Sequence, residues 1–355
     1  MRIGLIGFGV GGSAFHAPLI AATDGLELAA VVTSNPERAG AARANYPKAA
    51  VVAHPRELWD LGLDAVTITT PNSSHAPLAH DALDHGLNVV VDKPLATNVA
   101  DAESLVDHAE EAGLLLTVYL NRRWDGDFLT VAELVESGTL GKVHRFESRF
   151  ERWRPQVVPS WKETTSDGGG ILFDLGPHVI DQAVCLFGPV AAAYAEVGRV
   201  RADAVNDDDV FLALTHRNGV RSHLWLSAVA ADLGPRFRVL GNRGGYRIFG
   251  MDPQESALRS GLVPSPDAAR WGAREAADDG VRCSGDGEFA QPTQRGNYLR
   301  FYQLWAAALR GDGPVPVDPA DAVATLRIIE AAGRREWSVF DEEFLPSQPT
   351  AEHPE

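Results

Sequence analysis

Apolar runs separated by mixed segments follow one another along the first third of the chain. The runs are apolar at nearly every position, which is typical of strands buried on both faces of a parallel sheet. We expect such strands at Ile3–Ile6, Leu28–Val32, Ala65–Ile68, Val89–Val91 and Leu114–Val118, with a shorter one near Ala50–Val52. Helices are expected between them at Ala14–Ala22, Pro77–His85 and Ala100–Ala112. This alternation predicts an α/β domain with a doubly wound parallel sheet over residues 1–122.

The pattern changes after about residue 140, where many apolar positions alternate with polar ones. Asn218-Gly219 lies between two such segments and is typical of a hairpin turn. We expect strands at Val143–Arg154, Ala193–Arg201, Val210–Thr215, Arg221–Ser227 and Phe237–Leu240. Helices are expected at Ile171–Leu186, Asn297–Leu309 and Pro319–Arg334. Residues 123–340 are therefore predicted to form an α+β domain, an open and mostly antiparallel sheet with helices on one face.

Two segments lack these patterns. Ser260–Pro292 is rich in Gly, Pro, Asp and Ala, and we expect it to be irregular. Residues 341–355 hold five acidic residues and no Lys or Arg, so we expect a disordered acidic tail.

Composition narrows the function classes. The formal net charge of −16 argues against nucleic acid as a partner, because phosphate contacts need a basic surface. No apolar run is long enough to suggest a membrane span or a leader, so we expect a cytoplasmic protein without a membrane partner. The two cysteines, Cys185 and Cys283, predict no disulfide, and Cys185 is expected to be a buried thiol. Only four of the 32 Lys and Arg residues are lysines, so each lysine is of more interest as a candidate functional residue.

A glycine-rich turn follows the first predicted strand. Gly7, Phe8, Gly9 and Gly12 form a G-x-G-x-x-G motif that opens the first helix. In this context the motif predicts a dinucleotide site: Gly7 makes the turn, Gly9 admits the pyrophosphate, and Gly12 allows close packing. The first domain is thus predicted to have a Rossmann fold.

The tip of the second strand bears on the choice of cofactor. NAD enzymes usually place an acid there to bind the ribose hydroxyls. This chain instead has Ser34, Asn35 and Arg38, which suit a 2′-phosphate and favour NADP, with NAD still possible. Ser34 and Glu37 also have the spacing of a helix capping box, so the segment has a structural interpretation as well.

Two further segments carry candidate chemistry. Asp92-Lys93 comes at the end of the Val89–Val91 strand, where ligands of doubly wound folds bind. On the predicted helix, Asp174, His178 and Asp181 are spaced to share one face. A cation and a histidine beside a nicotinamide can orient a carbinol oxygen and move its proton. The histidines His75, His80 and His85 are five residues apart, which does not suit a metal site on one helix, and no metal is expected.

With these motifs the chain resembles the glucose–fructose oxidoreductase/inositol dehydrogenase (Gfo/Idh/MocA) family. Other stretches resemble the NADP-dependent scyllo-inositol dehydrogenases within it, namely Ser13–Leu19, Asn121–Asp125, Asp127–Thr130 and Arg154-Pro155. The resemblance covers nearly the whole chain and implies an NAD(P)-dependent dehydrogenase acting on the CH–OH groups of a cyclic polyol. Asp92 stands where the family usually has Glu, and Asn35 where it often has Arg.

The resemblance also implies roles for individual residues. Lys93, Asp174 and His178 would be catalytic, with His178 as the general base. Thr70, Pro71, Asn72, His75 and Asp92 would join Lys93 and the glycine loop in binding the cofactor. The expected contacts to the polyol are Asn121, Arg123, Trp161, Asp181 and Tyr298, although each has an alternative interpretation as scaffold.

Two alternatives to this function remain open at the level of sequence. The chain could act on another sugar or keto-sugar, and less plausibly it could be a non-catalytic nucleotide-sensing regulator. A homodimer or homotetramer is expected, because both alternating sets on two predicted strands contain apolar residues. One set is Leu212, Leu214, Leu224 and Leu226, and the other is Phe211, Ala213, His223 and Trp225.

Overall fold

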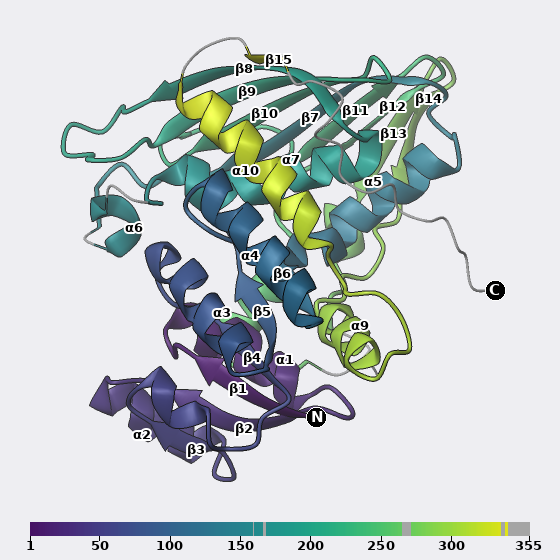
Figure 1. Ribbon diagram of the computed structural model, residues 1–355. Coiled ribbons are helices and arrows are strands. Elements are labelled where there is room, and N and C mark those ends of the chain that lie inside the picture. Colours follow the sequence, from purple (N-terminus) through teal and green to yellow (C-terminus); the bar gives the residue numbers. More distant parts are fainter. Residues whose placement is uncertain (159, 166–167, 265–270, 335–337, 340–355) are drawn as a thin grey trace.

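The computed structural model describes all of the chain except residues 159, 166–167, 265–270, 335–337 and 340–355 (Figure 1). The predicted acidic tail, residues 341–355, lies outside the described residues. The described part forms two domains, each built on one sheet, with the first domain below the second in Figure 1. None of the described helices is long and apolar enough to cross a membrane.

The first sheet is parallel, and its six strands have the order β3-β2-β1-β4-β5-β6. The strands are β1 (Arg2–Ile6), β2 (Glu27–Val32), β3 (Ala50–Val52), β4 (Ala65–Ile68), β5 (Asn88–Asp92) and β6 (Leu116–Tyr119). All the predicted strands are present, and the doubly wound sheet is confirmed. The strand order reverses between β1 and β4, and ligands of such folds bind beside that point, at the carboxyl ends of the strands.

Helices connect these strands. They are η1 (Gly11–His16), α1 (Ala17–Ala21), α2 (Pro36–Asn45), α3 (His75–Asp84) and α4 (Val99–Ala112), with the short 3₁₀ turns η2 (Pro55–Leu58) and η3 (Asn72–Ser74). The predicted helix Ala14–Ala22 is divided, since η1 has π-helical hydrogen bonding and α1 follows it. Helix α2 was indicated only by the capping-box spacing at its start, because few of its residues are apolar and only Ala39 and Ala42 are buried.

The second sheet has nine strands in the order β14-β13-β12-β11-β7-β10-β9-β8-β15. Its pairs are antiparallel except for β7 with β10, so the prediction of an open, mostly antiparallel sheet is confirmed. The strands are β7 (Val143–Glu151), β8 (Val190–Gly198), β9 (Asp209–His216), β10 (Arg221–Ser227), β11 (Phe237–Gly241), β12 (Gly245–Ile248), β13 (Gly280–Ser284), β14 (Gly287–Gln291) and β15 (Ser338–Val339).

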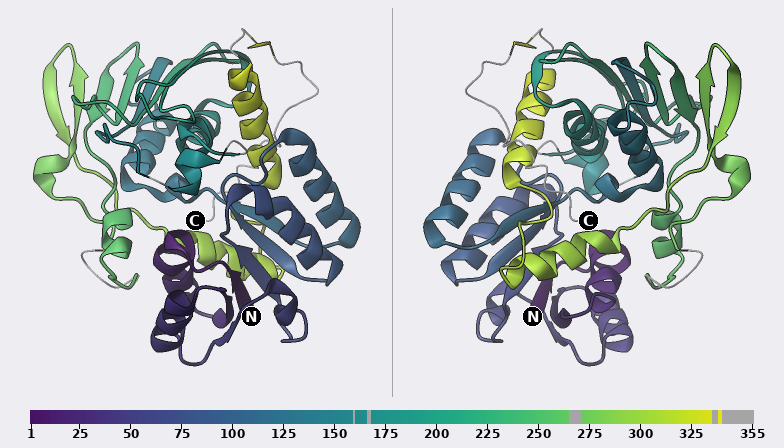
Figure 2. Two further views of the ribbon diagram at one scale, coloured as in Figure 1. Left: turned by 90° about the vertical axis from the view of Figure 1, so that its left-hand side faces the viewer. Right: turned by 90° about the vertical axis from the view of Figure 1, so that its right-hand side faces the viewer.

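Helices cover the face of this sheet that looks toward the first domain (Figures 1 and 2). They include α5 (Gly126–Glu136), α7 (Ile171–Phe187) and α10 (Pro319–Gly333). Shorter elements are η4 (Asn121–Trp124), α6 (Trp161–Thr164), α8 (Gln254–Arg259) and η5 (Ala276–Asp278). Among the described residues no helix lies on the opposite face.

The register of β9 and β10 decides which alternating set is buried. Leu224 is paired with Leu212, and both are fully buried under the helices. Trp225 is paired with Phe211, and these two residues lie on the open face together with His223. The leucine set therefore belongs to the core, and the aromatic set to a surface without a helix.

Two expectations about the second domain are wrong. The segment Ser260–Pro292 is not irregular throughout, because β13 and β14 form a hairpin at the edge of the sheet. The side chains of this hairpin are mostly exposed, so the apolar alternation that predicts strands is missing. Cys185 is exposed rather than buried, because the last turn of α7 presents it to solvent.

Helix α9 (Leu299–Leu309) packs against the first domain, although it comes late in the chain (Figure 2). The hydroxyl of Tyr302 lies 2.7 Å from Nδ1 of His16, and the ring of Phe301 packs edge-on against Tyr119. Thr117 on β6 donates a hydrogen bond to the carbonyl of Val317, just before α10. These buried contacts hold the two domains together and fix the carboxyl ends of β5 and β6 beside α7.

Candidate active site

The glycine-rich loop leaves one side free for a ligand. Gly7 has φ of +101°, and a Cβ there would lie 2.7 Å from the carbonyl oxygen of Thr69. A Cβ on Gly12 would overlap the carbonyl oxygen of Gly7. At Gly9, by contrast, the nearest heavy atom to a Cβ would be Nη1 of Arg38, at 3.8 Å. Gly7 and Gly12 are thus needed for packing, whereas Gly9 keeps open the side on which a pyrophosphate binds in such loops.

Helix α2 begins directly beside this loop. Asn35 is its N-cap, and its Oδ1 accepts a hydrogen bond of 3.0 Å from the amide of Arg38. The predicted capping by Ser34 is therefore wrong, because the helix begins one residue later than that motif requires. The side chains of Ser34 and Arg38 are exposed, and no hydrogen bond or ion pair to them is found among the described residues. Both remain free to bind a phosphate, with the Arg38 guanidinium close to Gly9.

The loop after β4 uses most of its polar side chains within the protein. Asn72 is buried and donates a 2.7 Å hydrogen bond to the carbonyl of Gly168 in the second domain. The ring nitrogens of His75 lie 2.8 Å from the Pro94 carbonyl oxygen and 2.9 Å from that of Thr70. The side chains of Asn72 and His75 therefore hold the loop in shape. Thr70 is partly buried and Pro71 is exposed, so these two residues are the accessible part of the loop.

Asp92 ends β5 and lies among cationic and polar groups. Its Oδ1 accepts the backbone amide of Lys93, and its Oδ2 is 3.7 Å from Nε2 of His16. Burial alone would raise the pKa of Asp92, but the nearby His16 ring and Lys93 ammonium lower that pKa to about 2. Asp92 is thus a fixed negative charge between the first helix and Lys93.

The central feature of the site is the Asp174 carboxylate, which two lysines contact. Nζ of Lys93 lies 3.0 Å from Oδ1 of Asp174, and 2.6 Å from the backbone oxygen of the same residue. Nζ of Lys162, on α6, lies 2.5 Å from the same Oδ1. Burial would raise the pKa of Asp174, but the two ammonium groups outweigh burial and hold that pKa well below its ordinary value. Burial lowers the pKa of Lys93, and the attraction of Asp174 opposes that shift.

Three consecutive glycines let α7 begin at this position. Gly170 has φ of +91°, and a Cβ there would overlap the carboxylate of Asp207. That carboxylate accepts a 2.7 Å hydrogen bond from the amide of Leu172, in the first turn of α7. Asp207 thereby caps the helix from a distant loop. Asp174 lies in the same first turn, where a negative charge is favoured by the helix dipole.

His178 follows Asp174 by one helical turn and is 7% exposed. Its Nδ1 has no hydrogen-bond partner among the described residues. Burial, and then the charges of Lys93 and Arg122, lower the pKa of His178 well below its ordinary value, although Asp174 opposes them. The imidazole is therefore neutral near pH 7 and able to accept a proton.

The predicted polyol contacts are placed differently. Arg123 forms a bidentate ion pair with Asp181, and its Nη2 also lies 2.8 Å from Oδ2 of Asp321 on α10. Tyr298 is fully buried, and its hydroxyl donates to Asp125. Asn121 is buried at the start of η4, whereas Trp161 on α6 is only partly buried, beside Lys162. The polar groups of Arg123, Asp181 and Tyr298 are thus engaged in contacts within the protein.

Four residues near the site were not predicted: His16, Arg122, Arg152 and Lys162. His16 and Arg122 lie within stretches that carry the family resemblance, and Lys162 is one of the four lysines, so weak signals existed for three of them. Arg152 had no such signal, because its position depends on how β7 packs over α7.

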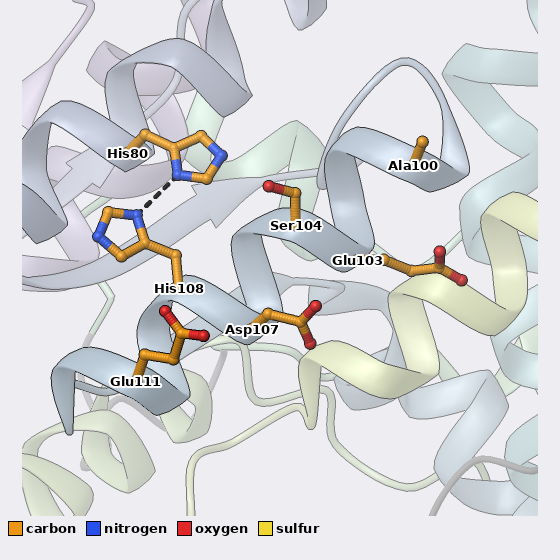
Figure 3. A pocket seen from close by; sticks show the side chains of 7 residues that line it. All are labelled: His80, Ala100, Glu103, Ser104, Asp107, His108 and Glu111. Atoms are coloured by element: carbon orange, nitrogen blue, oxygen red, sulfur yellow. Dashed lines mark hydrogen bonds between the residues drawn. The ribbon is translucent and has the colours of Figure 1, made fainter.

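A surface pocket of about 500 Å³ lies away from these residues, between α3 and α4 (Figure 3). His80 and His108 lie side by side at one edge of the pocket, with their Nδ1 atoms 2.8 Å apart. Its other lining residues are Ala100, Glu103, Ser104, Asp107 and Glu111. Within the described part of the chain, no group of three or more His, Cys, Asp or Glu side chains is placed to hold a metal ion.

Comparison with known proteins places this geometry in a family. Residues 1–120 match the model of the oxidoreductase family with an NAD-binding Rossmann fold, and residues 128–247 match the GFO/IDH/MocA C-terminal domain. The chain belongs to the Gfo/Idh/MocA oxidoreductase family.

Similar members of the Gfo/Idh/MocA family include proteins of known structure or named activity. The oxidoreductase YdgJ of Escherichia coli (strain K12) is 40% identical, over 93% of this chain and 94% of that protein. IolW of Bacillus subtilis (strain 168), named scyllo-inositol 2-dehydrogenase (NADP(+)), is 33% identical, over 94% of this chain and 92% of that protein. The solved structure of the oxidoreductase yvaA from Bacillus subtilis has a TM-score of 0.90 and 32% identity, covering 96% of this chain and 98% of that one.

The loop geometry predicts opposite outcomes for two glycine variants. Gly9→Ala places a methyl group on the open side of the loop, where it meets the cofactor and not the protein. Close contacts of this kind typically cost about 1–3 kcal/mol, so the affinity for NADPH should fall about tenfold or more. The melting temperature of the ligand-free protein should stay unchanged. Fluorescence titration with NADPH and thermal unfolding measure the two effects.

Gly12→Ala is the matched variant, because its methyl group overlaps the Gly7 carbonyl inside the protein. It should lower both the melting temperature and the affinity for NADPH. Equal melting temperatures for the two variants would show that the loop does not have the described geometry.

Proposed function

We propose that this protein is an NADP-dependent dehydrogenase of cyclic polyols, with scyllo-inositol and its ketone scyllo-inosose as the first candidates. The observation that carries the proposal is the arrangement of Lys93, Asp174 and a neutral, buried His178 at the carboxyl end of β5. The sequence of this chain is 33% identical to that of IolW over nearly its whole length, and this similarity supports the choice of substrate.

The residues divide the work between positioning and proton transfer. When bound, the nicotinamide accepts the hydride in oxidation and donates it in reduction. Lys93 orients the substrate oxygen with its ammonium group, which Asp174 holds in place. His178 accepts the hydroxyl proton during oxidation and returns it during reduction. Because its pKa is lowered, His178 is in the proton-accepting form throughout the neutral range.

The cofactor is held by the first domain. Gly7, Phe8, Gly9 and Gly12 would bind the pyrophosphate through the loop backbone, with Thr70 and Pro71 beside the adenosine. Ser34 and Arg38 would bind the 2′-phosphate, because both are exposed and no acid occupies the tip of β2. Asn35 contributes less, since its side-chain oxygen already caps α2.

The open face of the second sheet would form the contact between subunits. Phe211, His223 and Trp225 lie together there, with ring centroids 5.1–6.1 Å apart. The guanidinium of Arg149 lies 4.0 Å from the centre of the Trp225 ring, and Tyr194 is 39% exposed. An aromatic surface of this kind favours pairing with a second copy about a two-fold axis, giving a dimer or a dimer of dimers.

Removing the proposed proton carrier or its partner cation should abolish most of the activity. Lys93→Met and His178→Ala are each expected to lower kcat for polyol oxidation by about two orders of magnitude or more. Lys142→Met and His144→Ala change exposed residues of the same types and should leave kcat unchanged. Near-normal turnover by either site variant would exclude the mechanism.

The pH dependence has a definite sign. A lowered pKa keeps His178 unprotonated as the pH falls, so the acid limb of kcat/KM should lie below pH 6.5, the ordinary value for histidine. Lys93→Met removes a cation that lowers this pKa, so the acid limb of the residual activity should move to higher pH. A shift in the other direction would contradict the assignment of the base.

The cofactor preference depends on one side chain. Arg38→Ala should weaken the binding of NADPH by about tenfold and leave that of NADH within about twofold, because only NADPH has the 2′-phosphate. Arg43→Ala, at an exposed position later on the same helix, is the control. Equal losses for the two cofactors would show that Arg38 does not recognise the 2′-phosphate.

Sedimentation velocity tests the proposed assembly. The wild-type protein should sediment as a dimer or tetramer of 38.1 kDa chains at micromolar concentration. Trp225→Glu introduces a charge on the open face and should shift the equilibrium toward the monomer. A fully active wild-type monomer would contradict the proposed interface.

A further inference from the structure

The end of β7 carries one arginine to the side of the sheet that faces the site. Phe146, Ser148 and Phe150 alternate along this strand and are buried against the helices. Arg152 directly follows the last residue of β7, and its contact with the Phe150 ring places its guanidinium on the same side. Its backbone is held in place, since its amide donates to the Ser227 carbonyl and its carbonyl accepts from the amide of Ala230.

The guanidinium of Arg152 and the proposed base contact the same aromatic ring. The guanidinium is 4.9 Å from the centre of the Phe150 ring, and the same ring stacks with His178 at a centroid distance of 6.5 Å. Burial lowers the pKa of Arg152, and the charge of Asp174 opposes this shift. Arg152 is thus a partly buried cation on the second domain, next to the groups that would handle the substrate oxygen.

The arginines near Arg152 have hydrogen-bond partners within the protein: Arg236, over the same Phe150 ring, donates to Ser148 and Gln182, and two others are paired with carboxylates. Arg122 is paired with Asp125 and Glu255, and Arg201 with Glu163 and Asp208. Across the described residues, by contrast, the Arg152 guanidinium has no hydrogen bond or ion pair. The two carboxylates whose charges attract it are already occupied, Asp174 by two lysines and Glu255 by Arg122 and Arg259.

The Arg152 guanidinium is only partly buried, and its nitrogen donors, which have no acceptor among the described residues, stay available to a ligand. A guanidinium is a planar fork of donors that binds two neighbouring oxygens at once, which an ammonium group cannot do.

We propose that Arg152 is a specificity-determining residue that binds two adjacent oxygens of the substrate, away from the carbon that is oxidised. This inference rests on the proposed function, since Lys93 and His178 handle the reacting oxygen. The two oxygens belong to a vicinal diol, as in an inositol, or to a carboxylate, as in a sugar acid. Arg152 would then select substrates that carry such a pair of oxygens.

Steady-state kinetics of Arg152→Lys and Arg152→Met, at saturating NADP⁺, test this proposal. Arg152→Lys keeps the charge but loses the fork, so kcat/KM for scyllo-inositol should fall about tenfold, mainly through KM. Arg152→Met should lose about a hundredfold. The dissociation constant for NADPH should stay within about twofold in both variants, and Arg300→Ala, an exposed arginine on α9, should match the wild type.

Two pairs of compounds identify the source of the oxygens. For a diol, the wild type should prefer scyllo-inositol over its mono-deoxy analogue, and Arg152→Met should reduce that preference. If the two oxygens belong to a carboxylate, the wild type should prefer D-glucuronate over D-glucose, and Arg152→Met should reduce that preference. Unchanged preferences in both pairs, or kcat/KM within twofold of the wild type, would overturn the proposal.

Stability and direct binding separate this role from a structural one. Because the described residues give the Arg152 guanidinium no ion pair and only a contact with the Phe150 ring, Arg152→Met should leave the melting temperature nearly unchanged, whereas loss of a structural ion pair would lower it. Calorimetric titration of the four compounds into the NADPH-loaded protein gives affinities without turnover. If the wild type turns over these compounds and the Arg152 variants behave like it, only the Arg152 proposal is contradicted. If the wild type neither turns over nor binds any of the four compounds, the proposed function is contradicted as well.

Discussion

The ion pair between Lys93 and Asp174 is the contact on which the rest of the site depends. Lys93 comes from the end of β5 in the Rossmann domain, and Asp174 from the first turn of α7 in the second domain. A buried lysine tends to lose its proton, and a buried carboxylate tends to gain one. Each charge therefore persists because the other domain supplies its partner. His178, one turn further along α7, is kept neutral by the same burial and by the nearby cations.

Much of this arrangement follows from local sequence. The strands of the first sheet are mostly apolar, so their positions could be predicted, and with them the placement of Lys93 at a strand end. The spacing of Asp174 and His178 on one helix likewise brings both to one side. The family resemblance added the assignment of these residues to a single reaction.

What the sequence could not provide depends on tertiary packing. Asp181 has the helical spacing of Asp174 and His178, yet the approach of η4 pairs it with Arg123. Arg152 becomes a site residue only because β7 lies over α7, and Lys162 only because α6 folds back toward Asp174. The β13–β14 hairpin was missed because its side chains are exposed and lack an apolar pattern. The side chain of Asn35, and not that of Ser34, caps α2, because the helix begins one residue later than the sequence motif requires.

The transfer of the hydride itself is the most direct test of this account. scyllo-Inositol that carries deuterium on its ring carbons would be incubated with the protein and NADP⁺, and the NADPH formed would be analysed by mass spectrometry and NMR. The account predicts NADPH one mass unit heavier, with deuterium at C4 of the nicotinamide and scyllo-inosose as the other product. NADPH of natural mass, or no NADPH from any inositol, would contradict the central claim.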